Sequence, residues 1–530
     1  MAADDHIAED QGAIAGFLAD PATHGGAPVE CIDTYAAMVF LAGDAAYKVK
    51  RAVRYSFMDF SSLAKREAAC RAELALNRRT APALYRRVAA ITREADGRLA
   101  LDGAGAPVEW AVVMRRFDQD DLFDRLAARG ALTEDHVCAA VAAAARLHRE
   151  AEIVRDPPGD TGSGIGLAGT IAEIAGELAE RPDLIGADAR RACMDALHAA
   201  LAGVAPLLDR RRADGMVRRA HGDLHLGNIA LVDGRATLFD CIEFNDAIAC
   251  IDVLYDIAFL LMDLEQRDLG RLANRALNAW VPAAPGGAAA TIEALAALPL
   301  MLALRAGIRA MVESKAGAAQ GDAQKRRAHD AAACAYFAAA HGFLASFPPC
   351  LVAVGGFSGS GKSSLARALA PDLGRAPGAV HLRSDAIRKE LCGVAETARL
   401  PDAAYSRAMN DRVYAEMFAR ARLALQAGQA AIVDGVNSDP AGRADLRKLA
   451  GQAGAPFTGF WLDAPASTLK ARVTARRGDA SDADAAVVAR QLRDDPGPVD
   501  WHRLDAGGGA DTVAAAARRL LAGRAPLSRD

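Results

Sequence analysis

Two stretches of this chain carry residue types that could hold the phosphates of a nucleotide. The first follows an apolar segment and is the run Gly356-Phe357-Ser358-Gly359-Ser360-Gly361-Lys362-Ser363-Ser364. Glycines let backbone N–H groups turn toward phosphate oxygens, Lys362 would reach the β- and γ-phosphates, and Ser363 would bind Mg²⁺. Because the chain has only nine lysines among 63 basic residues, a lysine at this position is informative. The spacing therefore predicts a Walker A loop that binds ATP through residues 356–364.

Two carboxylates and an arginine follow this loop, close to the ends of later apolar segments. Asp385 comes directly after the segment 379–384, where it would accept the proton of a substrate hydroxyl. Arg388, one helical turn further on, would hold the acceptor or the phosphoryl group in transfer. A helix N-cap at Asp385 with a solvated Arg388 is the alternative interpretation. Asp434, in the segment AAIVDGVN, is a Walker B-type carboxylate that would orient Mg²⁺ or its waters.

A basic helical segment lies about 110 residues after the Walker loop. It reads LKARVTARRGDASDA and places Arg472 and Arg476 four residues apart, on one helix face, before a Gly/Ser/Asp loop. Such a segment can act as a lid whose arginines stabilise phosphoryl charge and exclude water, with Arg477 or Arg490 sharing the work. A solvated basic face is the alternative for each arginine.

The second phosphate-handling stretch lies far upstream and reads HGDLHLGNIALVDGRATLFD over residues 221–240. Asp223 would orient an acceptor hydroxyl and accept its proton, while Asn228 and Asp240 would hold Mg²⁺. An Asp-Gly turn between Asn228 and Asp240 predicts a hairpin that brings the two metal ligands together. The alternative is that His-Gly-Asp is an ordinary turn and that Asp240 caps an element. Asp252 and Asp256, further on, are expected to brace the loop through backbone hydrogen bonds.

The elements that must position these residues change character along the chain. Residues 28–60 and two segments near 90 and 110 read as short strands, with an amphipathic helix between them, and residues from about 120 to 345 are almost wholly helical. Beyond Phe347-Pro348-Pro349, strands at 351–357, 379–384, 430–435, 457–463 and 502–505 alternate with helices. The sequence therefore predicts an α+β domain over 1–345, with a small β-rich lobe and a large helical lobe. An α/β domain with a parallel, doubly wound sheet follows over 350–530.

The C-terminal motifs resemble one group of P-loop kinases. GGFSGSGKSS, the Asp385/Arg388 pair, IVDGVN and the RVTARRGDASDA segment are similar to the group containing polynucleotide 5′-hydroxyl kinase, gluconate kinase and zeta-toxin-like kinases, over about 350–525. The resemblance implies an ATP- and Mg²⁺-dependent kinase. A polynucleotide acceptor would need a basic groove with stacking aromatic residues, which this half lacks, so a small hydroxylated metabolite is favoured.

The N-terminal half resembles the aminoglycoside-phosphotransferase-like kinases through HGDLHLGN and LFDCIEFND, over roughly 30–340. The resemblance implies a protein-kinase-like fold with an ATP-binding strand lysine, either Lys48 or Lys50. The helix carboxylate paired with that lysine would be Glu73, with Glu67 as the alternative. The half departs from the pattern because Cys241 follows Asp240 and no Gly-rich phosphate loop is evident.

The tandem order is similar to bacterial proteins described as bifunctional aminoglycoside phosphotransferase/ATP-binding proteins. An aminoglycoside is a polycation and needs an acidic pocket, yet acidic residues are sparse over 255–345. We therefore expect an ATP- and Mg²⁺-dependent phosphotransferase acting on a small hydroxylated molecule. The alternative is a P-loop ATPase switch regulated by an N-terminal pseudokinase or ligand-sensing lobe.

The overall composition of the chain limits the classes of partner that we expect it to bind. The 63 basic and 67 acidic residues are nearly balanced, which does not favour nucleic acid or an anionic membrane as a partner. The start is acidic and polar rather than a signal peptide, and the longest apolar stretch is interrupted by Pro299. The nine cysteines lack metal-ligand spacing. These features predict a cytoplasmic protein and leave its oligomeric state open.

Overall fold

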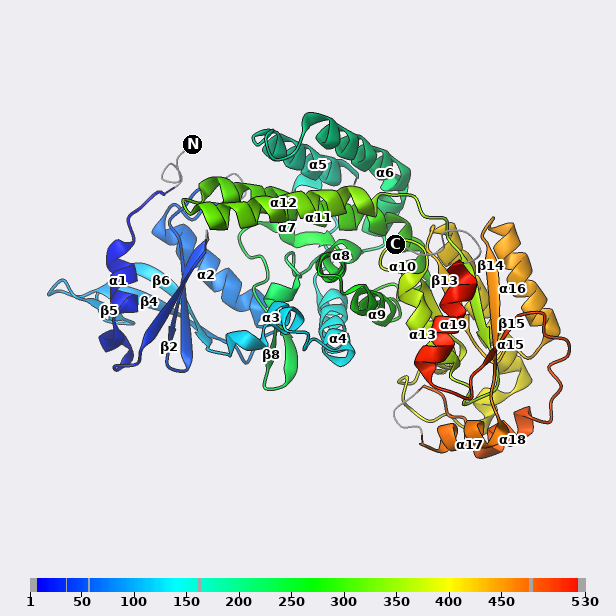
Figure 1. Ribbon diagram of the computed structural model, residues 1–530. Coiled ribbons are helices and arrows are strands. Elements are labelled where there is room, and N and C mark those ends of the chain that lie inside the picture. Colours follow the sequence, from blue (N-terminus) through cyan, green and yellow to red (C-terminus); the bar gives the residue numbers. More distant parts are fainter. Residues whose placement is uncertain (1–6, 35, 56–57, 161–163, 476–479, 523–530) are drawn as a thin grey trace. The chain divides into compact units, whose positions relative to one another are not determined.

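The computed structural model describes residues 7–34, 36–55, 58–160, 164–475 and 480–522. They form two compact units (Figure 1). The first lies within residues 1–267 and 300–342, and the second within 268–299 and 343–530. The prediction of two domains, one α+β and one α/β, is confirmed.

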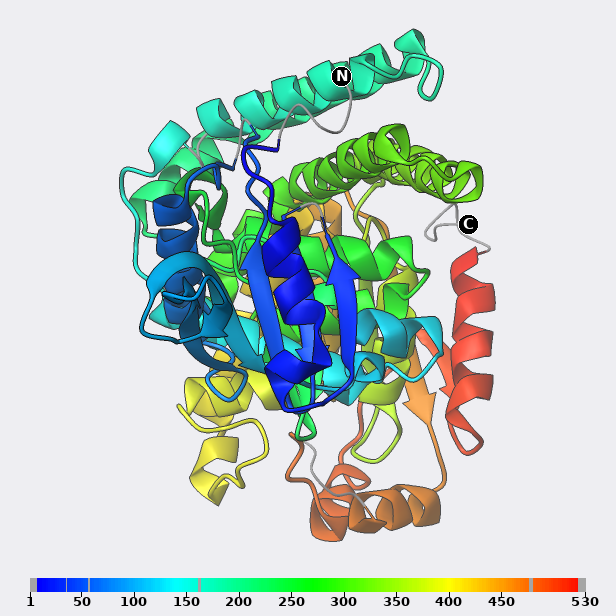
Figure 2. The ribbon, with the colours of Figure 1, turned by 90° about the vertical axis from the view of Figure 1, so that its left-hand side faces the viewer.

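The first unit begins with a six-stranded antiparallel sheet in the order β1-β2-β3-β6-β4-β5. Helix α1 packs on one face of the sheet through Ile14 and Leu18, and it lies in front of the strands in Figure 2. Helix α2 packs on the other face through Cys70 and begins where the Ser62 side chain accepts a hydrogen bond from the Lys65 N–H. The elements of this lobe are α1 Gly12–Ala19, β1 Val29–Asp33, β2 Ala37–Ala42, β3 Ala45–Lys50, α2 Leu63–Asn77, β4 Tyr85–Arg93, β5 Leu99–Leu101 and β6 Ala106–Arg115.

The helical part of the first unit also contains two small two-stranded antiparallel sheets, of which one is a hairpin. Strands β8 and β9 pair across a turn in which Asp233 and Gly234 have φ values of 51° and 71°, the conformation of a two-residue hairpin turn. The elements are α3 Phe123–Ala128, α4 Glu134–Glu150, α5 Gly164–Ala179, α6 Ala187–Ala213, β7 Val217–Arg219, β8 Ile229–Val232, β9 Arg235–Leu238, α7 Asp246–Ala249, β10 Cys250–Asp252, α8 Val253–Gln266, α11 Leu298–Ala319 and α12 Ala323–Phe343.

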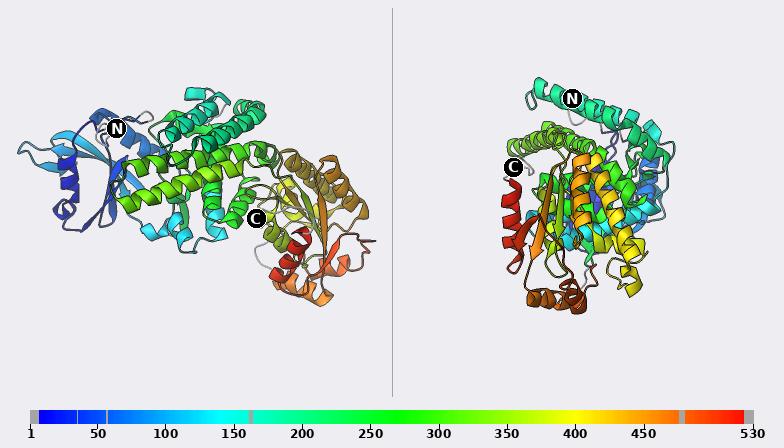
Figure 3. Two further views of the ribbon diagram at one scale, coloured as in Figure 1. Left: turned by 45° about the horizontal axis from the view of Figure 1, so that its top comes forward. Right: turned by 90° about the vertical axis from the view of Figure 1, so that its right-hand side faces the viewer.

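The second unit is built on a five-stranded parallel sheet in the order β12-β13-β11-β14-β15. Helices α13 and α19 cover one face and α15 and α16 the other (Figure 3, right). The elements after the first unit's last helix are β11 Leu351–Gly355, α13 Lys362–Leu369, β12 Val380–Arg383, α14 Ser384–Leu391, α15 Arg407–Gln426, β13 Ala431–Asp434, α16 Pro440–Gln452, β14 Phe457–Asp463, α17 Ala466–Ala475, α18 Ala485–Gln491, β15 His502–Asp505 and α19 Ala510–Ala522.

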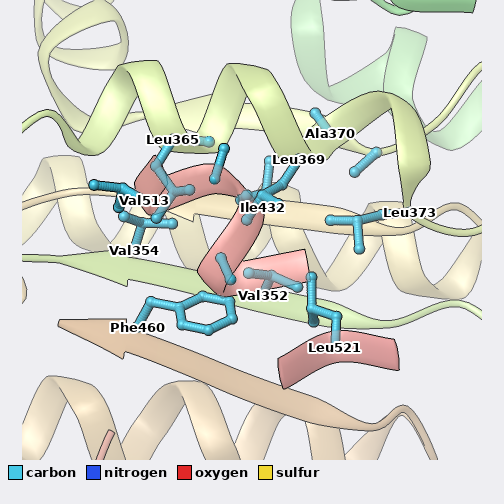
Figure 4. Packing of buried hydrophobic residues seen from close by; sticks show 14 of the residues in the cluster. Val352, Val354, Leu365, Leu369, Ala370, Leu373, Ile432, Phe460, Val513 and Leu521 are labelled. Carbon is cyan, nitrogen blue, oxygen red and sulfur yellow. The ribbon is translucent and has the colours of Figure 1, made fainter. Parts of the chain in front are cut away.

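One core cluster joins this sheet to α13 and α19. Val352, Ile432 and Phe460 from three neighbouring strands meet Leu369 and Leu521 from the two helices, and all are buried (Figure 4). Strands that are buried on both faces read as continuous apolar runs. This is why the central strands β13, β11 and β14 could be recognised in the sequence, whereas the edge strands β12 and β15 mix buried residues with more exposed polar ones.

Helices α9 Gly270–Trp280 and α10 Gly287–Ala294 belong to the second unit, although they precede α11 and α12 in the chain. The Asn274 amide donates to the Ala379 carbonyl at 3.0 Å, beside the edge strand β12. The P-loop unit therefore includes a helical segment from upstream of residue 300.

Two helical stretches in the described residues, Ala187–Ala213 and Gly287–Ala319, have the length and apolar composition of a membrane span. In the second stretch, 67% of the most apolar window is buried inside the protein, as expected of a core helix.

Candidate active sites

The loop between β7 and β8 is held rigidly by an aspartate of the neighbouring helix α8. Asp256 accepts hydrogen bonds from the backbone N–H groups of His221 at 3.1 Å and Gly222 at 2.9 Å. The buried His148 ring contributes a third contact to the same carboxylate at 2.9 Å. The expectation that Asp256 braces this loop is confirmed. Asp252 instead pairs with Arg211 through two 2.7 Å bonds, and as the N-cap of α8 it also accepts from the Leu254 N–H.

Asp223 and Asn228 lie together at the centre of the braced loop. The Asn228 amide nitrogen donates to Asp223 Oδ2 and to the Asp223 carbonyl, both at 2.9 Å. His225 Nε2 lies 3.3 Å from Asp223 Oδ2, while His225 Nδ1 accepts from the Gly227 N–H, which places the ring proton on Nε2. Burial alone would raise the pKa of Asp223, but His225, His221 and Arg305 hold it below its usual value. Asp223 is therefore an ionised carboxylate at neutral pH.

Lys48 of β3 joins two carboxylates that are distant in the sequence. Its Nζ lies 2.9 Å from Glu73 Oε1 on α2 and 2.5 Å from Asp240 Oδ1, a residue 192 positions away. Asp240 has a φ of 63°, and its N–H donates to the hydroxyl of the buried Tyr85. Burial would lower the pKa of Lys48, but the two carboxylates raise it well above the usual value. This lysine stays charged and can balance phosphate oxygens.

Lys50, on the same face of β3, pairs with Glu73 and with Glu243. Its side chain is only 4% exposed, against 12% for Lys48. Burial would raise the pKa of Glu73, but the two lysines lower it to about 2. Glu67, the alternative partner considered above, pairs with Arg71 on the helix surface.

The donors at Asn228 and Asp240 fit Mg²⁺ by their chemistry. Mg²⁺ prefers carboxylate and carbonyl oxygens, and Asp240 presents a carboxylate that is 39% exposed. The Asn228 nitrogen makes both bonds to Asp223, so the amide oxygen is the atom suited to a cation.

The Walker A loop runs from β11 to the first residue of α13, with positive φ values at Gly356, Gly359 and Gly361. A Cβ at Gly356 would lie 2.7 Å from the Leu462 carbonyl, and one at Gly359 would lie 2.5 Å from the Leu469 carbonyl. Only glycine fits both positions. Lys362 Nζ donates to the Phe357 carbonyl at 3.1 Å across the loop. Ser360 Oγ is buried and makes no hydrogen bond within the described residues, which fits a loop shaped for phosphate oxygens.

Asp434 lies at the carboxyl end of β13, where the register pairs it with Arg383 of β12. Its Oδ2 is 3.2 Å from His381 Nε2 and 3.7 Å from Arg383 Nε. Burial would raise the pKa of Asp434, but His381, Lys362 and Arg383 lower it to about 2. An ionised carboxylate and the hydroxyl of the Walker serine Ser363 are oxygen donors of the kind that suits Mg²⁺.

Asp385 lies in the first turn of α14 and Arg388 in its last turn. Burial raises the pKa of Asp385, opposed by a hydrogen bond to Ser481 and by the charge of Lys362. Arg388 is 5% exposed, donates to the Ala404 carbonyl at 2.9 Å and lies over the Tyr405 ring at 4.9 Å. Its Nε is buried without a hydrogen-bond partner in the described part of the chain.

The predicted lid arginines are only partly described. Arg472 donates to the carbonyls of Ala506 at 2.8 Å and Gly508 at 2.9 Å, so its guanidinium holds the β15–α19 connection. Arg476 and Arg477 lie outside the described residues, and Arg490 is exposed on α18. Gln491 of the same helix accepts from the Ser358 N–H at 2.8 Å and thus occupies one amide of the Walker loop.

Several polar residues at these sites were missed in the sequence. Glu243 lies three residues after Asp240, and His381 and Arg383 lie just before Asp385 in HLRSD. Asp482 accepts from Tyr405 at 2.7 Å and Lys389 at 2.6 Å. A charged residue inside an apolar strand was the available signal for His381 and Arg383. No local sequence pattern identifies Glu243 or Asp482 as a residue of the site.

Comparisons with protein families divide the chain in the same way. Residues 39–291 match the model of a phosphotransferase enzyme family, APH, and residues 351–495 match that of an AAA domain, AAA_33. With the two sites described above, the chain is an ATP-dependent kinase in which a phosphotransferase-family domain precedes a P-loop kinase domain.

The same tandem arrangement extends over full-length relatives. The chain belongs to the family of the uncharacterized protein Rv2004c of Mycobacterium tuberculosis strain H37Rv, to which it is 33% identical over 491 residues. That match covers 91% of this chain and 93% of the relative. The uncharacterized protein Mb2027c of Mycobacterium bovis matches to the same extent.

Several solved structures match part of the chain. A gluconokinase from Sinorhizobium meliloti 1021 is 26% identical, covers 34% of this chain and 94% of its own, and has a TM-score of 0.24. The aminoglycoside phosphotransferase APH(3'')-Id from Streptomyces rimosus is 18% identical, covers 55% and 98%, and has a TM-score of 0.33. A choline/ethanolamine kinase family protein from Mesorhizobium loti is 15% identical, covers 62% and 97%, and has a TM-score of 0.36.

Proposed function

We propose that this chain is a cytoplasmic, two-headed phosphotransferase. Each domain transfers the γ-phosphoryl group of ATP to a hydroxyl of a small metabolite, with Mg²⁺ as cofactor and without nucleic acid or membrane as partner. Mg²⁺ would be held by Asn228 and Asp240 in the first domain and by Ser363 and Asp434 in the second, where it would neutralise phosphate charge.

In the N-terminal domain, Asp223 orients the acceptor hydroxyl and takes its proton. The hydroxyl oxygen forms a bond to the γ-phosphorus, the bond from that phosphorus to the bridging oxygen breaks, and ADP leaves. The Nε2–H of His225 and the amide of Asn228 both contact Asp223, so they fix the carboxylate before the acceptor arrives. Lys48 binds the ATP phosphates while Glu73 holds it in place.

In the C-terminal domain, the Walker A amides and Lys362 bind the phosphates, and Asp385 takes the proton of the acceptor. Burial raises the pKa of Asp385, which makes it a stronger base than an exposed aspartate once it is ionised. Arg388 would bind the acceptor or the transferring group, and Arg476 would serve the lid, whereas the Arg472 guanidinium is engaged with the carbonyls of Ala506 and Gly508. The roles of Ser358, Ser360, Gly361 and Ser364 in binding ATP belong to the same proposal.

One observation favours the hypothesis that the N-terminal domain is an active kinase over the hypothesis that it is a ligand-sensing lobe. Lys48, Glu73 and Asp240 come from a strand, a helix and a loop, yet they meet within hydrogen-bond distance. A lobe that had lost phosphotransfer would have no need to keep this arrangement beside an ionised Asp223.

The test is ATP consumption by the purified chain against sugars, nucleosides and aminoglycosides, run beside Lys362→Ala and Asp223→Asn. We expect each variant to abolish a different acceptor-stimulated activity. Lys448→Ala and Asp195→Asn are matched controls, because both residues are exposed on helices, α16 and α6, that carry none of the proposed site residues.

The other outcomes separate the alternatives. If only Lys362→Ala removed acceptor-stimulated turnover, catalysis would belong to the C-terminal domain and the first domain would act as a sensor. Steady Lys362-dependent hydrolysis that no acceptor stimulates would leave a P-loop ATPase switch.

A further inference from the structure

Helix α11 brings a buried arginine close to the catalytic loop of the first domain. Arg305 is 3% exposed, and its Nε donates to the Tyr255 carbonyl at 3.1 Å. The guanidinium lies 3.9 Å from the centre of the Tyr255 ring and 4.8 Å from that of Phe259. The Phe259 ring in turn contacts the His225 ring at 5.2 Å, and His225 lies 3.3 Å from Asp223. Arg305 is thus connected to the catalytic carboxylate through the Phe259 ring and then the His225 ring.

The hydrogen-bonding capacity of this arginine is not filled. Arg305 Nη2 and the neighbouring Tyr255 hydroxyl are both buried, and neither has a hydrogen-bond partner within the described residues. No carboxylate of the described chain forms an ion pair with Arg305 at 4.0 Å or less, although its charge lowers the pKa of Asp223 and Asp256. A buried guanidinium remains charged and is costly to leave without an anion. Two unused donors on side chains that stack on each other are the arrangement expected for an absent oxyanion.

A second arginine lies one turn further along α11. Arg309 donates to Glu313 at 2.5 Å, lies 5.5 Å from the Tyr336 ring, and its side chain is 28% exposed. The negative charge of Asp223 contributes to a raised pKa of Arg309, although burial opposes the shift. Glu313 also contacts His329 at 2.7 Å, so this carboxylate is shared between two basic groups. Arg305 and Arg309, one turn apart on α11, therefore both interact electrostatically with Asp223, and Glu313 offsets part of the charge of Arg309.

We infer that the acceptor of the N-terminal domain carries an oxyanion, a carboxylate or a phosphate, as well as its hydroxyl. Arg305 Nη2 and the Tyr255 hydroxyl bind that oxyanion, and Arg309 attracts it at the more exposed end of the subsite. A polycationic amine would meet two guanidinium groups here and be repelled. This inference rests on the proposed phosphotransfer at Asp223, because it defines the acceptor of that site.

The test uses four probes with one carbon skeleton: gluconate, glucose 6-phosphate, glucose and glucosamine. Binding is measured by calorimetry on the full chain carrying Lys362→Ala, so that the C-terminal site does not turn over ATP. We expect the two anionic probes to bind more tightly than the neutral and cationic ones. A comparison of the affinities for gluconate and glucose 6-phosphate then shows whether the subsite prefers a carboxylate or a phosphate.

Substitutions assign the binding to this subsite. Arg309→Gln should weaken binding of the anionic probes about tenfold, the loss expected for one hydrogen bond to a charged group, and leave glucose binding unchanged. Arg305→Lys should also weaken it, because lysine keeps the charge but lacks the guanidinium fork. Arg326→Gln, at an exposed position on α12, is the matched control.

The outcomes separate this inference from the proposed function. Arg309-dependent binding of anions without any Asp223-dependent transfer would support the subsite and count against catalysis in this domain. Binding of glucosamine as tight as that of gluconate would overturn the inference. So would anion binding that is absent, or that is the same in the parent and in both arginine variants.

Discussion

The side-chain oxygen of Asn278 accepts a hydrogen bond from the backbone N–H of His381 at 2.7 Å. Asn278 also donates to the Ala379 carbonyl at 3.1 Å, which Asn274 reaches from one turn earlier. These bonds cover the outer edge of β12, the last strand on its side of the parallel sheet. An uncovered edge strand exposes unpaired backbone groups and promotes aggregation. Helix α9 falls within the residues matched by the phosphotransferase model, yet it completes the fold of the P-loop unit.

We expect the double variant Asn274→Ala, Asn278→Ala to destabilise the second unit. It leaves the Ala379 carbonyl and the His381 N–H without these partners, at a cost of about 1–3 kcal/mol for each buried group. Differential scanning calorimetry with and without ATP would show a lower Tm for the transition that ATP protects. Arg271→Ala, an exposed position on the same helix, is the control. An unchanged Tm would mean that solvent satisfies this edge equally well.

Replacement of Lys48 and replacement of Lys50 should affect different properties, catalysis in the first case and stability in the second. Lys48→Met should reduce kcat of the Asp223-dependent activity by about 100-fold or more, because a positive charge on the phosphates is lost. Lys50→Met should mainly lower stability, by about 3–5 kcal/mol, because it leaves buried Glu243 without its cation. Steady-state kinetics and urea unfolding of both variants would distinguish the roles. Loss of transfer in folded Lys50→Met, with transfer kept in Lys48→Met, would reverse this assignment.

The two activities should lose rate at different acidic pH values. A general base works only when it is deprotonated. Burial raises the pKa of Asp385, whereas the pKa of Asp223 is held low by His225, His221 and Arg305 against the opposing effect of burial. As the pH falls, the C-terminal activity should therefore decline first. Profiles of kcat against pH would be recorded for the C-terminal activity in Asp223→Asn and for the N-terminal activity in Lys362→Ala. Coinciding acid limbs would contradict these assignments.

Asp434 should contribute to the acid stability of the second unit. Its pKa is about 2 in the folded protein, below the usual value of 3.8, so its contribution is present above about pH 4 and is lost as the pH falls toward 2. The difference corresponds to about 2 kcal/mol at neutral pH. Urea unfolding of Asp434→Asn should accordingly depend less on pH between 4 and 2 than that of the parent. Asp439→Asn, at the N-terminus of α16, serves as a comparison, and equal slopes for parent and Asp434→Asn would be evidence against the shift.

Short-range patterns in the sequence predict many of the structural elements of this protein. The central strands β11, β13 and β14 could be located because each is a short, largely apolar run bounded by turns, and the Walker loop because its glycines are required by backbone geometry at fixed spacing. The hairpin at Asp233 and Gly234 and the helix that carries Glu73 are likewise local. In each case the decisive interactions lie within a few residues of one another.

Tertiary structure decided the rest, because those contacts join residues with no local relationship. Only the fold brings Lys48 within hydrogen-bond distance of Asp240, which lies 192 positions later in the chain. The fold also pairs Glu73 with both Lys48 and Lys50. Only packing assigns α9 to the second unit, since an amphipathic helix does not specify which sheet it will cover. Arg305 looks in the sequence like any arginine on an apolar helix. Its burial beside Tyr255 and Phe259, with a donor left over, exists only once α11 has packed against α8.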